Sequence, residues 1–154
     1  TGEFDFRHFR SIHYFLFCDL YDWAGQIRTI NISKKGTVFV SAAEIQACAD
    51  ACFTRLAAFT GEGRSHQEII EEIADFYSTI NMLHPFREGN GRTQRLFFTQ
   101  WIRHLGYEFD LSNADLDEFM IATIYAAQGV MDPLIKFFDE TIQEPIVGAD
   151  MALQ

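Results

Sequence analysis

Apolar side chains recur every three or four residues along most of the chain, which is the spacing of one face of an α-helix. The pattern predicts six helices, over residues 4–20, 41–59, 65–84, 91–104, 112–128 and 133–142. A Gly or Pro follows each of them, as is usual where a helix ends. The sequence therefore predicts a mainly α fold.

The expected helix starts carry side chains that can accept a hydrogen bond from free backbone N–H groups. Ser followed three residues later by Glu forms a capping box at Ser41 and again at Ser65. The other expected caps are Asp5, Ser112 or Asn113, and Asp132 with Pro133 at the first helical position. The helix from Ser65 should stop just before Pro85, because the proline ring disfavours helical backbone at the preceding residue.

One short segment has the alternation of β-strands instead. Residues 29–32 and 37–40 flank the turn Lys34-Lys35-Gly36, and the whole predicts a β-hairpin. Because an isolated two-stranded hairpin is marginal in water, it must be anchored at its base, with its tip free to touch another molecule.

Length and composition fit one domain, expected over residues 1–145 with a frayed tail over 146–154. The chain is 48% hydrophobic and contains 16 Phe, which is ample for one core. No apolar run approaches the roughly 20 residues of a membrane span, so no membrane partner is expected. The formal net charge of −10 likewise argues against nucleic acid as a partner.

Isolated cysteines and histidines are expected to be structural. Cys18, Cys48 and Cys52 are interpreted as small buried apolar residues in a reducing compartment. The alternative is that the helical pair Cys48 and Cys52 helps to hold a metal. His8 and His13, in the first predicted helix, are expected to be packing or surface residues.

Most of the chemistry lies in one polar loop between two apolar helices, at residues 84–95. A helix N-terminus presents free N–H groups and attracts phosphate, and Gly89 and Gly91 let the backbone approach an anion closely. Asn90 can donate its side-chain amide to the same anion. Arg92 and Arg95, three residues apart on the first turn, can bind further phosphates.

The remaining loop residues complete a set suited to transfer from a nucleoside triphosphate. Glu88 would repel phosphate alone, but it suits a site in which Mg²⁺ lies between a carboxylate and phosphate oxygens. A neutral His84 can take a proton from an incoming hydroxyl. Phe86 is expected to anchor the loop in the core, and Arg87 to make a surface contact.

Residues 84–95 resemble the signature of the Fic (filamentation induced by cAMP) family, His-x-Phe-x-(Asp/Glu)-Gly-Asn-Gly-Arg-x-x-Arg, at every fixed position. Further segments resemble the family's opening helix and turn (Ile12-His13 and residues 19–25), its flap hairpin (residues 35–39) and its late helix entry (residues 129–134). The resemblance implies a Fic-type helical bundle with one small β-hairpin flap.

The resemblance also implies a protein adenylyltransferase, which moves AMP from ATP to a Ser, Thr or Tyr hydroxyl of a target protein and releases pyrophosphate. His84 would be the base and Glu88 would bind Mg²⁺. Gly89, Asn90 and Gly91 would surround the α-phosphate, and Arg92 and Arg95 would hold the outer phosphates. The flap would position the target by strand addition, through Ile32, Lys35, Gly36, Thr37 and Phe39. For the adenine pocket, Tyr125 and its helix neighbours are candidates.

Alternatives remain open at this point. Relatives with Lys in place of the second Gly are kinases, so Gly91 favours AMP transfer, but transfer of a phosphoryl group, another nucleotide or phosphocholine is an alternative. So is a nucleotide-binding module without turnover.

No Ser or Thr has Glu four residues later, so the inhibitory helix of many relatives is missing. It would lie upstream of Thr1, come from a separate antitoxin-like protein, or be absent. The expected location is the bacterial cytoplasm, or a host cell after delivery.

Overall fold

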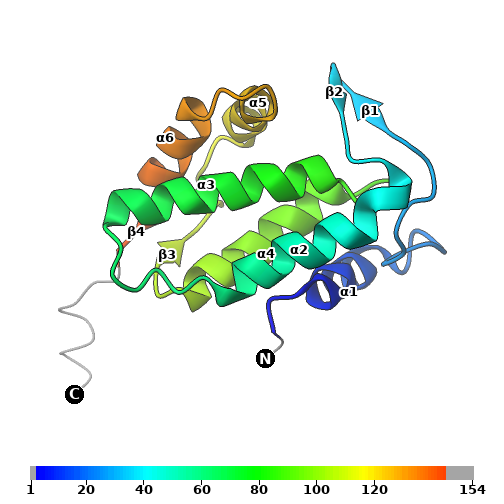
Figure 1. The fold of residues 1–154 in the computed structure, drawn as a ribbon, viewed down its shortest axis with the longest axis horizontal. Helices are drawn as coiled ribbons and strands as arrows, with labels where there is room; N and C mark the ends of the chain where they lie inside the picture. Colours follow the sequence, from blue (N-terminus) through cyan, green and yellow to red (C-terminus); the bar gives the residue numbers. More distant parts are fainter. Residues whose placement is uncertain (1–2, 145–154) are drawn as a thin grey trace.

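In a computed structural model, residues 3–144 are described, and they form six α-helices and two short antiparallel strand pairs (Figure 1). The helices are α1 Phe6–Phe17, α2 Ile45–Ala58, α3 His66–Leu83, α4 Asn90–His104, α5 Leu116–Ala127 and α6 Asp132–Thr141. The strands are β1 Ser33–Lys34 paired with β2 Thr37–Val38, and β3 Glu108–Phe109 paired with β4 Ile142–Gln143. The 3-10 turn η1, Ala42–Glu44, precedes α2.

Helix α3 lies in the middle of the bundle and contacts α2, α4, α5 and α6 (Figure 1). Helices α1, α2 and α4 lie on one side of it, and α5 and α6 lie on the other. The buried apolar side chains of all six helices form one contiguous cluster, in which aromatic rings such as Phe53, Phe97 and Trp101 meet edge to face or tilted. The prediction of a mainly α fold with one small hairpin is confirmed. The hairpin, formed by β1 and β2, projects from the bundle near the end of α3 (Figure 1).

Two of the expected helix caps are confirmed, and the others differ. Asp5 accepts from the His8 N–H and Ser65 from the Glu68 N–H. Ser41 does not cap α2, because a 3-10 turn intervenes and its hydroxyl donates to the Glu44 carboxylate instead. Helix α5 starts after Asp115, not at Ser112 or Asn113, and α6 already includes Asp132.

The strands also differ from the prediction in extent. Residues 29–32 are not paired as a strand, because the Asn31 side chain accepts from the Ala42 N–H and only one backbone bond, from the Phe39 N–H to the Ile32 carbonyl, continues the ladder. The pair β3–β4 was not predicted at all. A two-residue strand is too short to show a period in the sequence.

The expectation that all three cysteines are buried is wrong. Cys18 and Cys48 are exposed, and only Cys52 is buried. Burial raises the pKa of the Cys52 thiol to about 11, so this side chain behaves as a small apolar core residue. Within residues 3–144 no three His, Cys, Asp or Glu side chains are grouped as metal ligands, so the alternative metal role of Cys48 and Cys52 gains no support.

The expected tail over residues 146–154 lies outside the described residues. Among residues 3–144, no helix combines the length and the apolar character that crossing a bilayer would need.

The cap of α5 gives a test of this architecture. Asp115→Ala is expected to lower the free energy of unfolding by about 1 kcal/mol, because it removes the acceptor of the Asp117 and Glu118 N–H groups. Urea unfolding followed by circular dichroism measures the change. Asn113→Ala, at an exposed position outside the helix, is the matched control and should change stability by only a few tenths of a kcal/mol. Equal losses in both variants would contradict this helix start.

Candidate active site

The candidate site begins at the C-terminus of α3, where His84 ends the helix in a left-handed conformation with φ of 39°. A side chain with a Cβ adopts this region reluctantly, and Pro85 excludes a helical alternative. The helix therefore stops where the sequence predicted, and the backbone conformation of His84 fixes where its side chain projects from the end of α3.

The His84 ring is stacked on Phe39 from the hairpin, with centroids 3.9 Å apart and planes 9° from parallel. Burial, helped by the positive charges of Arg28 and Lys34, lowers the pKa of His84 to about 4. At neutral pH the imidazole is therefore uncharged and able to accept a proton.

A buried arginine that the sequence analysis did not single out joins the hairpin to this point. The side chain of Arg28 is 2% exposed and donates to the carbonyls of Ile30, Val40, Leu83 and His84. Two backbone bonds reinforce the junction, from Arg28 to the Pro85 carbonyl (2.8 Å) and from Val40 to the Met82 carbonyl (3.0 Å). The expectation that the hairpin is anchored at its base is thus confirmed, and Arg28 is the main anchor.

Asn90 closes the loop from inside. Its side-chain oxygen accepts from the Phe86 N–H (2.9 Å), and its amide donates to the Phe86 carbonyl (2.8 Å). The Phe86 side chain is fully buried and stacks on His13 and Phe9, so its expected role as a core anchor is confirmed. A direct bond from Asn90 to phosphate stays a prediction, because one N–H of its amide is already used.

His13 is a packing residue as expected, and it also supports the loop. The Gly25 N–H donates to its Nδ1, and its Nε2–H donates to the Glu88 carbonyl, each at 2.8 Å. These partners fix the neutral Nε2–H tautomer, and burial lowers the pKa of the ring. The backbone beside the carboxylate of Glu88 is thereby held from α1.

Gly89 and Gly91 meet different steric demands. Gly89 has φ of +79°, and a Cβ there would lie 2.4 Å from the Phe17 ring, so only glycine fits. A Cβ at Gly91 would lie 3.1 Å from Nη1 of Arg95. The first N–H groups of α4, on Asn90, Gly91 and Arg92, have no acceptor within the helix, which leaves them for an anion.

The charged residues of the loop point outward from this frame. The guanidinium of Arg92 lies over the Phe17 ring at 5.7 Å and that of Arg87 over the Trp23 ring at 5.4 Å. Arg87 therefore makes a surface contact, with an aromatic ring. Glu88 is exposed and makes no ion pair within residues 3–144, so its carboxylate is available to a cation.

A cavity of about 260 Å³ adjoins the loop and is walled by the hairpin, α3, α4 and α5. Of the predicted site residues, it brings together His84, Gly91, Arg95, Lys35, Thr37 and Phe39. Ile32 and Gly36 of the hairpin are outside its lining, as are Glu88, Gly89, Asn90 and Arg92 at the helix start. On α5, Thr123 and Ile124 line the cavity, whereas Tyr125 does not.

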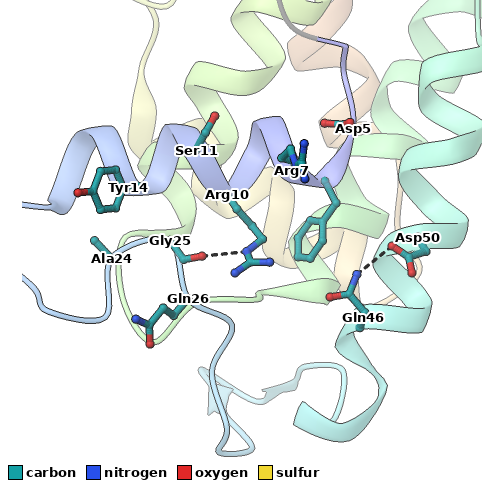
Figure 2. Close-up of a pocket in the computed structure, with 11 residues that line it drawn as sticks. Asp5, Arg7, Arg10, Ser11, Tyr14, Ala24, Gly25, Gln26, Gln46 and Asp50 are labelled. Carbon is teal, nitrogen blue, oxygen red and sulfur yellow. Dashed lines mark hydrogen bonds between the residues drawn. The ribbon is translucent and has the colours of Figure 1, made fainter.

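A larger hollow of about 550 Å³ lies away from the loop, between α1, residues 24–26 and the start of α2 (Figure 2). Arg10 crosses it and donates through Nε to the Gly25 carbonyl. Its rim mixes basic and acidic side chains, such as Arg7 and Asp50, and it contains none of the predicted site residues.

Comparison with known proteins agrees with this geometry. The sequence model of the Fic/DOC family matches residues 3–102. A protein of Sinorhizobium fredii, named a probable protein adenylyltransferase, is 39% identical over 135 residues, which are 86% of this chain and 70% of that protein. Protein adenylyltransferase VbhT of Bartonella schoenbuchensis is 35% identical over 140 residues, 88% of this chain but 29% of that longer protein. Among solved structures, the chain is similar to the N-terminal Fic domain of a VirB-translocated Bep effector from Bartonella quintana, which was solved with bound ADP. The TM-score is 0.88 and the sequence identity is 27%, and the match covers 100% of this chain and 78% of that one.

The anchor gives a prediction of its own. Arg28→Lys keeps the charge but cannot reach all four carbonyls, so it is expected to cost at least about 2 kcal/mol of stability. Hydrogen exchange of residues 30–40 should accelerate more than that of α3, because the loss is local to the hairpin. Arg7→Lys, at an exposed position of α1, is the control. Uniform acceleration across the chain would show that Arg28 is only a general stability determinant.

Proposed function

The chain belongs to the Fic/DOC family, and from this we infer that it transfers AMP from ATP to a Ser, Thr or Tyr hydroxyl of a target protein and releases pyrophosphate. The observation that carries the proposal is a neutral His84 held beside the open N-terminus of α4, at the mouth of one cavity. A base next to an anion-binding helix start is what attack of a hydroxyl on a phosphate requires. Relatives named as protein adenylyltransferases support the same reaction.

The step proceeds by attack of the acceptor oxygen on the α-phosphorus of ATP. The acceptor proton moves to a ring nitrogen of His84, a bond forms between the acceptor oxygen and phosphorus, and the bond from phosphorus to the pyrophosphate oxygen breaks. The free N–H groups of Asn90, Gly91 and Arg92 stabilise the negative charge that builds on the α-phosphate. Arg92 and Arg95 hold the leaving pyrophosphate.

Glu88 is the proposed ligand of Mg²⁺. Its carboxylate is exposed and free of ion pairs among the described residues, and its own backbone carbonyl is fixed by His13. A single carboxylate suits Mg²⁺, which usually takes one or two protein ligands and completes its shell with water and phosphate oxygens. When bound there, the ion would neutralise charge on the nucleotide phosphates.

Gly91 leaves space for the Arg95 guanidinium at the cavity. Because a Cβ at this position would press on Arg95 at 3.1 Å, any side chain there would move the guanidinium. Glycine leaves Arg95 at the cavity, where the outer phosphates are expected. We propose that this unblocked arginine is the point at which a separate antitoxin-like protein would inhibit the enzyme.

Labelling with radioactive ATP tests the reaction. With Mg²⁺ and a cell lysate, adding the protein should increase the label on protein from α-labelled ATP and should not increase the label from γ-labelled ATP above that of the lysate alone. His84→Ala should reduce the initial rate by at least about 100-fold, because proton transfer is lost. His104→Ala, an exposed histidine at the other end of α4, is the matched control and should label normally. Protein labelled from γ-labelled ATP would instead support a kinase, and full activity of the His84 variant would reject this base.

The pKa of His84 predicts an unusual pH profile. With a pKa of about 4, its neutral form persists, so kcat/KM should stay flat from about pH 8 to about pH 5 and fall about tenfold per pH unit below about pH 4. An unshifted histidine, with a pKa of 6.5, would lose activity about 2.5 pH units earlier. The folded-state pKa lies below the unfolded one, so the stability from the neutral ring is also lost as the pH falls from 6.5 towards 4. Circular dichroism at each pH separates unfolding from protonation of the base.

We also propose that the protein acts in the bacterial cytoplasm or inside a host cell after delivery. The support is the similarity to a Bartonella effector that is translocated by VirB.

A further inference from the structure

The chain has only three lysines, and two of them are at the tip of the hairpin. Lys34 ends β1 and Lys35 begins the turn, and both line the catalytic cavity. The third, Lys136, is on α6 and pairs with Glu140 four residues along the helix. In a chain with 22 acidic residues and 12 basic ones, such placement concentrates scarce positive charge at one site.

No carboxylate from the described part of the chain balances these lysines in the cavity. Among residues 3–144, its lining includes Lys34, Lys35 and Arg95 but no Asp or Glu. Within residues 3–144, neither lysine makes an ion pair, and the Lys35 ammonium lies 3.9 Å from the Met120 sulfur rather than near a carboxylate. The hairpin therefore offers two ammonium groups to whatever enters the cavity.

The backbone conformation of Lys35 indicates that this position requires the lysine side chain and that the turn itself does not. Lys34 pairs with Thr37, so Lys35 and Gly36 form a two-residue turn, with φ of 52° and 82°. Turns with two positive φ values favour Asn-Gly or Asp-Gly, because Asn and Asp tolerate this region better than other residues with a side chain. A lysine at the first position costs stability that Asn would not, and residues kept in such conformations are often functional.

We propose that Lys34 and Lys35 select target segments that carry an acidic side chain close to the acceptor hydroxyl. The proposal rests on the proposed AMP transfer and names the class of target. The nucleotide phosphates already have the α4 N-terminus with Arg92 and Arg95, which belong to another element. The lysines lie on the hairpin, beside Phe39 and His84, where the acceptor must approach the base.

The first experiment maps the modified sites. A lysate is treated with the protein, ATP and Mg²⁺, and mass spectrometry locates AMP on peptides. The expected result is that Asp or Glu is enriched within about four residues of the modified hydroxyl, or beside it in the folded target. Modified sites without such enrichment would overturn the proposal while leaving AMP transfer in place. No modified protein at all would instead overturn the proposed function on which it rests.

Variants then test the lysines on the most strongly modified target. Lys35→Asn is expected to reduce kcat/KM for this target by about tenfold, although Asn suits the turn better and should keep the hairpin folded. Lys34→Gln should act in the same direction and is measured at about pH 8, where His84 is neutral with or without this charge. Lys136→Gln removes an equal charge far from the cavity and should change nothing.

A charge exchange makes the assignment specific. The Lys35→Glu variant should have a low kcat/KM on the natural target, and its kcat/KM should recover when the acidic residue of that target is changed to Lys.

The KM for ATP should stay within about twofold in all these variants. A KM for ATP that rises as much as target labelling falls would assign the lysines to the nucleotide, and unchanged labelling by Lys35→Asn would remove Lys35 from target selection. Either result would overturn the proposal.

Discussion

The buried guanidinium of Arg28 is the interaction on which the site depends. An ion withdrawn from water is costly unless its donors are satisfied, and here four backbone carbonyls take the place of a carboxylate. These carbonyls belong to both arms of the hairpin and to the last turn of α3. One side chain therefore holds the hairpin, which is the proposed acceptor-binding element, in register with His84, the proposed base. Its positive charge adds to the effect of burial, which lowers the pKa of His84.

The loop turns the side chains of Phe86 and Asn90 inward, whereas its charged side chains and the first backbone donors of α4 face outward. The Asn90 side chain bonds to both backbone groups of Phe86, His13 donates to the Glu88 carbonyl, and Gly89 lies against Phe17. Because these contacts come from α1 and from the loop, the N–H groups at the start of α4 stay free for phosphate. All of these contacts are made within the chain itself, which suits electrostatic stabilisation without reorganisation.

The fold class and the site loop could be predicted from the sequence because both depend on residues that lie close together in the chain. Helical periodicity and the contiguous residues 84–95 need no knowledge of distant contacts. Arg28 was missed because its partners are up to 56 residues away, and a buried arginine has no periodic signal. The start of α5 was misplaced because several capping residues stand in a row before it. The two-residue strands β3 and β4 are defined by their pairing, not by their composition.

The stack of Phe39 on His84 has a consequence for ATP that is bound without a target. One face of the imidazole is covered by a phenyl ring, and the His84 side chain borders the cavity, from which a water molecule can approach it. Under the proposed reaction, the acceptor hydroxyl would occupy that same space. Hydrolysis of ATP and transfer of AMP would then compete for the same space between the hairpin and α5.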